Sequence, residues 1–205
     1  MTICIVNCYH WIGFHLANEF LEMGQEVIGI DQADTDFKEN LAMFLGRNSA
    51  FQCHAAVQPC HTIIVVPKFV QEQGQAAATI QITNKMETRE VCFEIQHPFL
   101  YGEWMPMTSE AGCCQGISLK WHTQAFSKKA IWIRDFTKMI RVFLKAHVIP
   151  ERLELVSSLD PIAKMKDKRS IVLVRSTDVT EKKAALLDHF QRFSFLYQAN
   201  GTMAP

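Results

Sequence analysis

The sequence predicts an α/β fold in which helices flank a mostly parallel sheet. Two apolar runs, over residues 2–6 and 26–30, enclose an amphipathic stretch in which Ile12, Leu16 and Phe20 recur at four-residue spacing. A glycine follows the last periodic residue, where helices commonly end. Because a helical connector makes its two flanking strands parallel, this unit predicts the fold class.

The rest of the chain continues the alternation of strands and helices. We expect strands over 51–57, 62–66, 76–83, 91–95 and 153–156, and helices over 39–45, 135–148 and 179–195. Asp135 is expected to be the N-cap of the helix over 135–148. Only about ten residues separate the three central strands, whereas a parallel crossover usually needs a dozen or more. At least one of their pairings is therefore expected to be antiparallel, or a helix has been lost.

Composition excludes several classes of function. The 205 residues carry 21 basic and 21 acidic side chains and are 48% apolar, which is typical of one soluble domain. The one local basic run, over 164–169, is interpreted as a solvated loop, so no nucleic-acid partner is expected. The chain has no apolar stretch of membrane-spanning length, and Glu19 and Glu22 interrupt its N-terminal apolar segment. We expect a cytoplasmic protein without a membrane partner.

The cysteines do not indicate a disulfide framework or a metal site. Seven cysteines make an odd number, and several lie in apolar, strand-like runs. Cys53 and Cys60 each precede a histidine, but the chain contains no C-x-x-C, so no zinc site is predicted. Cys113 and Cys114 are interpreted as ordinary thiols rather than reactive ones, because sequence alone places no pKa-lowering neighbour beside them.

The turn after the first strand is where a dinucleotide would bind. In a dinucleotide-binding unit this turn is rich in glycine, because the backbone must approach the pyrophosphate at the helix N-terminus. Residues 7–13 read Asn-Cys-Tyr-His-Trp-Ile-Gly, so only Gly13, the glycine that permits close helix–strand packing, is present. Asp31 ends the second strand, where an acidic residue would accept hydrogen bonds from a ribose; it is equally suited to capping the next turn.

At these residues the sequence resembles the extended short-chain dehydrogenase/reductase family, especially its nucleotide-sugar epimerases and dehydratases such as UDP-glucuronate epimerase. Matching segments run in family order: 11–16 is similar to the turn and helix start, 27–31 to the second strand, 98–104 to the passage into the nucleotide-sugar site, 132–135 to an aromatic-hydrophobic-Asp-Asp motif, and 177–187 to a late helix start. The resemblance implies a Rossmann-like fold.

The resemblance also implies where ligands would lie. The cofactor-binding candidates are Asn7, His10, Trp11, Ile12, Gly13 and Asp31, and the candidates of the substrate-like loop are Tyr101, Gly102, Trp104 and Asp135. NAD(P) is the cofactor that the family uses, and a nucleotide or nucleotide sugar is the ligand class. We assign no catalytic residue and no metal ligand, and His97, beside the family's strand end, receives no role.

The chain departs from the family where catalysis takes place. Family members carry a tyrosine followed four residues later by a lysine that lowers the tyrosine's pKa. Here Tyr9, Tyr101 and Tyr197 are followed at that position by glycine, methionine and glycine. The interval in which the family places this pair is shortened between Val66 and Val91. The sequence thus predicts a truncated, degenerate member without oxidoreductase or epimerase catalysis.

Three further departures concern binding. Asn7 and His10 replace glycines in the turn, and side chains there intrude where the pyrophosphate needs bare backbone. Residues 105–107, directly after Trp104, read Met-Pro-Met and lack the arginine of the family's phosphate-binding loop. Arg134 stands at the first acidic position of the motif over 132–135 and so reverses its charge. We favour the interpretation that the residue 9–11 loop fills the crevice with its own aromatic side chains over a catalytic or stacking role for His10.

We therefore expect one degenerate Rossmann-like domain over 1–205, with a substrate-domain remnant at about 101–130 and 157–205. The favoured function is that of an epimerase-like pseudoenzyme with a binding, regulatory or structural role. Two alternatives stay open. One is a minimal NAD(P)-dependent epimerase or reductase in which His10 or Cys113 replaces the lost acid/base, and the other is a protein-interaction module. The oligomeric state is open, because the family's dimerisation helix falls in the shortened interval.

Overall fold

The computed structural model describes residues 2–54, 56, 60–66, 79–86, 89–96, 99–114, 117–145, 152–157, 171–174 and 179–199. Several residues discussed in the sequence analysis lie outside these ranges. They are the basic run over 164–169, His97, the first residue of the 98–104 segment, the beginning of the 177–187 segment, and much of the interval between Val66 and Val91.

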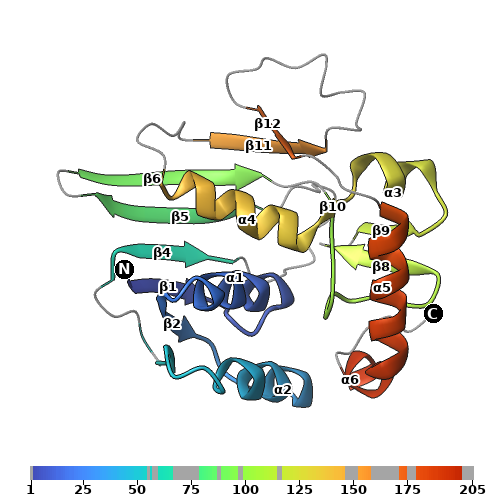
Figure 1. Cartoon of the computed structure of the whole chain (residues 1–205), viewed down its shortest axis with the longest axis horizontal. Helices are drawn as coiled ribbons and strands as arrows, with labels where there is room; N and C mark the ends of the chain where they lie inside the picture. Colours follow the sequence, from blue (N-terminus) through green and yellow to red (C-terminus); the bar gives the residue numbers. More distant parts are fainter. Residues whose placement is uncertain are drawn as a thin grey trace.

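An eight-stranded sheet forms the centre of the molecule, in the order β12-β11-β6-β5-β4-β1-β2-β3 (Figure 1). Its register is parallel from β3 through β2 and β1 to β4, and again from β6 through β11 to β12. The strands are β1 (Thr2–Val6), β2 (Glu26–Ile30), β3 (Phe51–Cys53), β4 (Thr62–Val65), β5 (Thr79–Met86), β6 (Arg89–Gln96), β11 (Arg152–Ser157) and β12 (Ile171–Val174). The Rossmann-like α/β class is confirmed.

Strand β5 runs against both of its neighbours. It pairs antiparallel with β4 and with β6, and the two residues between β5 and β6 are too few for a parallel crossover. One face of these strands is closely packed: Ile64, Ile82 and Phe93 are at most 2% exposed. Gln81 and Cys92, on the alternate face, are exposed. The prediction of antiparallel pairing in the shortened interval is confirmed.

Three helices lie side by side over the sheet (Figure 1): α2 (Asp36–Leu45), α1 (Trp11–Glu22) and α4 (Ile133–Phe143). Helix α1 packs on β1 and β2 and contacts α2 and α4. It ends as predicted, because Gly24 follows its last turn at φ 71°, a backbone conformation that glycine adopts without strain.

The remaining described elements lie beyond the carboxyl ends of the parallel strands (Figure 1). The short strands β7 (Leu100–Tyr101) and β10 (Ile131–Trp132) pair in parallel, and β8 (Ala111–Cys114) pairs antiparallel with β9 (Ile117–Lys120). Helices α3 (Gln124–Lys129), α5 (Val179–Arg192) and α6 (Ser194–Ala199) complete this end. They surround the carboxyl edge, where α/β proteins place their ligands.

Several element boundaries differ from the prediction. Helix α4 begins at Ile133 with Trp132 as N-cap, so Asp135 lies in its first turn and is not the cap. Helix α2 begins three residues earlier than expected, because the Thr35 hydroxyl caps it by accepting from the Lys38 amide at 3.3 Å. Strand β3 ends at Cys53, and the predicted C-terminal helix is interrupted at Phe193 to give α5 and α6.

Among the helices of the described residues, none combines the length and the apolar character needed to cross a membrane.

Candidate functional site

Asn7 holds together the carboxyl ends of three parallel strands. Its backbone adopts a left-handed conformation at φ 61°, which asparagine tolerates better than most residues. Its amide N–H donates to the Ile30 carbonyl at the end of β2 (2.8 Å), and its side-chain Nδ2 donates to the Val66 carbonyl just beyond β4. The Asn7 side chain therefore bridges β1 and β4 at the point where the strand order reverses.

His10 caps the helix that starts at this turn. Its backbone is extended, and its Nδ1 accepts a hydrogen bond from the Ile12 amide at 3.4 Å. Behind it, Gly13 lies so close to the Asn7 carbonyl that a Cβ atom there would collide with the backbone. The predicted role of Gly13 in close packing is confirmed by this contact, while Trp11 and Ile12 are buried in the core.

The Asp31 carboxylate faces the same turn. One oxygen accepts from the Tyr9 amide at 3.0 Å, and the other accepts from the Gln32 amide at 2.8 Å and from Lys38 Nζ at 3.2 Å. Burial alone would lower the pKa of Lys38, but its contacts with Asp34 and Asp31 raise that pKa above its ordinary value. The side chain of Asp31 is only 4% exposed.

Tyr101, Gly102 and Trp104 of the predicted substrate-like loop are buried, whereas Asp135 is partly exposed. The Tyr101 ring packs against Phe126 and Trp132 with centroids 4.9 and 5.1 Å away, and Gly102 lies so close to Ile133 that no Cβ would fit. Trp104 follows at φ 65°, an uncommon conformation for a bulky residue. The loop is therefore part of the packed interior.

Trp104 is the centre of an aromatic cluster that joins distant helices. Its indole meets Phe37 and Phe44 of α2 at 6.2 and 5.9 Å between centroids. It also meets His189 and Phe193 near the end of α5 and stacks on Tyr197 of α6; the cluster comprises Phe37, Phe44, Trp104, His189, Phe193 and Tyr197. These rings occupy the space between α2 and the C-terminal helices.

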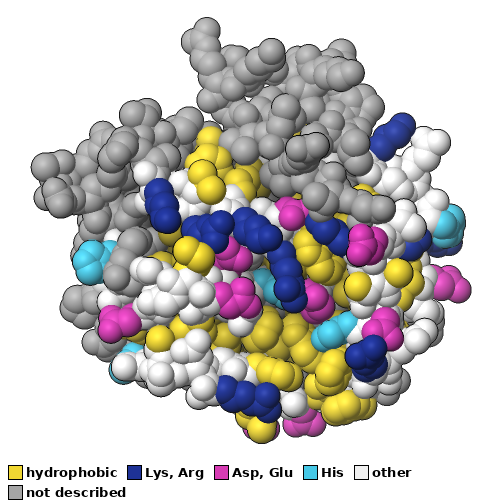
Figure 2. Space-filling view, viewed as in Figure 1, with side chains coloured by type: hydrophobic (Ala, Val, Ile, Leu, Met, Phe, Trp, Pro, Cys, Tyr) yellow, Lys and Arg dark blue, Asp and Glu magenta, His cyan; other side chains and the backbone are white. Residues whose placement is uncertain are grey.

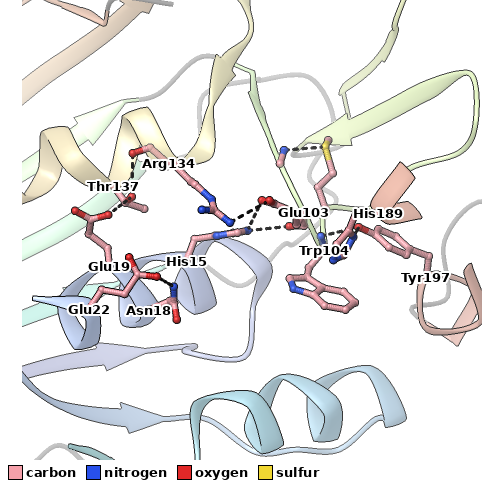
Figure 3. A network of polar contacts seen from close by, with 12 residues as sticks. His15, Asn18, Glu19, Glu22, Glu103, Trp104, Arg134, Thr137, His189 and Tyr197 are labelled. Atoms are coloured by element: carbon pink, nitrogen blue, oxygen red, sulfur yellow. Dashed lines mark hydrogen bonds and ion pairs between the residues drawn. The ribbon is translucent and has the colours of Figure 1, made fainter. Parts of the chain in front are cut away.

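A polar network lies beside this cluster (Figure 3). His15 of α1 is 7% exposed, and its Nε2–H donates to the Glu103 carbonyl at 2.9 Å, with the Glu103 carboxylate 3.7 Å away. Arg134 of α4 reaches the same carboxylate at 3.2 Å. Burial lowers the pKa of His15 below its ordinary value of 6.5, against the opposing influence of Glu103. His15 is therefore neutral and acts as a hydrogen-bond donor.

The network continues on the other side of Trp104. Tyr197 Oη accepts from the Trp104 amide at 2.8 Å and lies 2.9 Å from His189 Nδ1, so its own proton is available to that nitrogen. Burial lowers the pKa of His189, and burial raises the pKa of Tyr197. Both groups are therefore neutral at pH 7, and their hydrogen bonds fix the loop of Trp104 to α5 and α6.

The structure brings together some of the predicted site residues and separates others. The turn residues and Asp31 form one cluster. A hydrogen bond between His15 and the Glu103 carbonyl links the loop of Tyr101, Gly102 and Trp104 to α1. Asp135 stands apart, bound to Lys182 of α5 at 2.6 Å. Cys113 lies in the β8–β9 hairpin.

Sequence reasoning missed His15, Glu103, Arg134, His189 and Tyr197. One signal was available: His15 and Glu19 are polar residues on the otherwise apolar face of α1, and both are buried. In the described part of the chain, no three His, Cys, Asp or Glu side chains are grouped to hold a metal ion.

Comparison with known proteins identifies a likeness of fold. No protein-family model matches the sequence, and no curated protein matches it significantly. Among solved structures, a mutant UDP-glucuronic acid 4-epimerase from Bacillus cereus, in complex with UDP-4-deoxy-4-fluoro-glucuronic acid and NAD, is similar at a TM-score of 0.52. The alignment covers 94% of this chain and 99% of the epimerase chain, with 11% sequence identity. At that identity the chain shares with the epimerase a distant Rossmann-like fold.

Proposed function

We propose that this chain is an epimerase-like pseudoenzyme, a Rossmann-like domain that no longer holds a dinucleotide in the usual pose and serves a binding, regulatory or structural role. The observation that carries the proposal is the hydrogen bond from the Asn7 side chain to the Val66 carbonyl, which bridges β1 and β4. In open α/β sheets, ligands enter at this point of strand reversal.

The start of α1 supports the proposal. A pyrophosphate bound in the usual pose needs bare backbone in the turn and free N–H groups at the helix N-terminus. Here the Asn7 side chain is bonded to the Val66 carbonyl, and the His10 imidazole accepts from the Ile12 amide. These residues do not fit a dinucleotide in that pose.

The position that would bind the adenosine ribose of the cofactor is also altered. In the family, an acidic residue at the end of the second strand receives the ribose hydroxyl groups. Both oxygens of Asp31 instead accept hydrogen bonds from this chain, one of them from the turn that the cofactor would contact. Asp31 thus fixes the closed turn in place.

The tyrosines support the loss of catalysis. An acid/base tyrosine needs a lowered pKa, which the family obtains from the lysine four residues later. None of the three tyrosines has that lysine. Burial raises the pKa of Tyr9 and of Tyr197, the opposite direction, and Tyr101 is fully buried. In this proposal, β7 to α3 and α5 to α6 are the remnant of a substrate domain.

The proposal is tested by isothermal titration of the purified protein with NAD⁺, NADP⁺ and UDP-glucose, after mass spectrometry of the denatured sample has excluded a retained ligand. We expect no binding of either dinucleotide. Micromolar binding of a dinucleotide that is lost in Asp31→Ala would overturn the proposal, as would turnover of a UDP-sugar that depends on His10 or Cys113. Binding of UDP-glucose alone would identify the ligand class of the binding role.

A second variant tests the reason for the closure. Asn7→Gly/His10→Gly restores glycine at both altered positions of the turn and should gain measurable NAD⁺ binding, whereas the matched single variant Asn48→Gly, in a distant loop, should not. If the double variant folds and still binds nothing, Asn7 and His10 are not what closes the crevice.

A further inference from the structure

Two cysteines far apart in the sequence meet above the glycine of a third strand. Cys8 lies in the turn after β1, and Cys53 ends β3; β2 runs between them. Gly29 of β2 is the registered partner of Cys53, and a Cβ at Gly29 would lie 2.6 Å from Cys8 Sγ. The missing side chain at Gly29 therefore leaves space between the Cys8 thiol and Cys53, and the nearby Cys53 thiol adds to the burial that raises the pKa of Cys8.

The two thiols differ in their access to solvent. Cys8 is fully buried, whereas Cys53 is exposed. Burial raises the pKa of the Cys8 thiol, so it stays protonated at neutral pH. Cys53 Sγ also lies 3.8 Å from the Asp31 carbonyl oxygen. An exposed thiol beside a buried one is the arrangement in which the first is oxidised and the second resolves the product.

We propose that Cys8 and Cys53 form a redox-sensitive dithiol that a hydroperoxide oxidises to an intrachain disulfide. In the first step the Cys53 sulfur attacks the peroxide, the O–O bond breaks, and Cys53 sulfenic acid and water form, or an alcohol where the peroxide is organic. In the second step the Cys8 sulfur displaces the sulfenic hydroxyl group, which leaves as water with the Cys8 proton. The two thiols together lose two electrons to the peroxide.

The disulfide would fix the turn that closes the crevice. It would link the residue 8 turn to β3 across β2, beside Tyr9, whose amide is held by Asp31. The cross-link encloses the chain between residues 8 and 53 and so restricts the unfolded state. Oxidation should therefore raise the midpoint of thermal unfolding, and a thiol reductant should reverse the rise. This proposal for the thiol pair does not depend on which ligand the crevice binds.

A second pair of thiols offers an internal comparison. Cys60 lies near enough to Cys4 to add to the burial that raises the pKa of the Cys4 thiol. Cys4 is fully buried and Cys60 is partly exposed, so neither thiol of this pair is as accessible as Cys53. Peroxide should reach the Cys8–Cys53 pair first.

The test treats the full chain with a small excess of hydrogen peroxide, alkylates the remaining thiols and maps cross-linked peptides by mass spectrometry. We expect the Cys8–Cys53 peptide to appear before any other cross-link and to disappear with dithiothreitol. Cys53→Ser should abolish this peptide and the shift in thermal midpoint, whereas Cys92→Ser, at another exposed cysteine, should preserve both. Oxidation of Cys53 to sulfinic acid without cross-linking, or prior formation of a Cys4–Cys60 link, would overturn the proposal.

Discussion

At the scale of single residues, the site is built from side chains in unusual positions. Asn7 and Trp104 are the non-glycine residues with positive φ in the described ranges, and each lies where segments converge. Asn7 joins β1 to β4, and Trp104 joins the loop after β7 to three helices. Such positions persist only where surrounding contacts offset the backbone cost.

Two replacements of Asn7 separate the contribution of its side-chain hydrogen bond from the cost of its left-handed backbone conformation. Asn7→Gly removes the hydrogen bond to the Val66 carbonyl but relieves the backbone, so we expect a loss of about 1 kcal/mol in the free energy of unfolding. Asn7→Ala removes the same bond and adds the cost of a left-handed alanine, for a total of about 2–3 kcal/mol. Urea unfolding of both variants checks the order. An alanine variant as stable as the glycine variant would contradict it.

His15 should make stability depend on pH. Its pKa is lowered in the folded protein, so between that value and the ordinary 6.5 the unfolded chain binds more protons than the folded one. Stability is therefore complete above pH 6.5 and falls as the pH drops below it. The neighbouring charges are Glu103, which opposes the shift, and Arg134, which supports it, and His189 contributes in the same direction.

The measurement is urea unfolding at about pH 7.5 and about pH 5.5. His15→Gln retains an N–H donor for the Glu103 carbonyl without titrating, so its loss of stability on acidification should be smaller than that of the wild type. His122→Gln, at an exposed histidine, is the matched control and should behave like the wild type. Equal pH dependence in all three proteins would contradict the assignment.

At the scale of elements, α1 and α4 are joined by an ion pair and a hydrogen bond between residues far apart in sequence. Arg141 contacts the carboxylate of buried Glu19 at 3.1 Å, and the Thr137 hydroxyl lies 3.4 Å from its other oxygen. Basic side chains run in a row across this face with acidic ones beside them (Figure 2). The exposed Arg134 and Lys138 belong to α4, and Arg134 is neutralised by Glu103. Both arginines of α4, Arg134 and Arg141, are therefore paired with carboxylates.

A double-mutant cycle measures this contact. For Glu19→Gln and Arg141→Gln we expect a coupling free energy of about 1–2 kcal/mol, because Glu19 is shielded from solvent. The control cycle, Asp188→Asn with Arg192→Gln, concerns an exposed pair within α5 and should give less than about 0.5 kcal/mol. Similar couplings in the two cycles would show that burial adds nothing to the α1–α4 contact.

The same scale shows what sequence could predict. The β1–α1–β2 unit, the apolar face of α4 and the antiparallel step at β5 follow from periodicity and connection length, which are local properties. Sequence did not predict β7 to β10, because strands of two to four residues carry too little pattern. It also missed the His15–Glu103–Arg134 network. His15 and Glu103 are separated by 88 positions in the sequence, and Glu103 and Arg134 by 31, so only the fold brings them together.

At the scale of the whole molecule, Trp104 connects the helices that cover the sheet to the helices of the C-terminal end. Its indole touches α2 on one side and α5 and α6 on the other, and its amide donates to Tyr197 Oη. Phe195 of α6, by contrast, is 64% exposed. Trp104 and its hydrogen-bonded loop thus help to hold α5 and α6 against the rest of the molecule, together with the Lys182–Asp135 ion pair between α5 and α4.

Trp104→Ala should therefore release α5 and α6 selectively. Removing a buried tryptophan costs about 3–5 kcal/mol. The loss falls on the C-terminal helices, because the parallel strands keep their own ladder and the packing of α1. Hydrogen exchange should show amides of α5 and α6 losing protection while those of β1 and β4 keep it, and Phe195→Ala should leave both sets unchanged. Loss of protection to the same extent in β1 and in α5 would mean that the C-terminal helices and the sheet unfold as one cooperative unit, so that the aromatic cluster and the Asn7 turn belong to the same core.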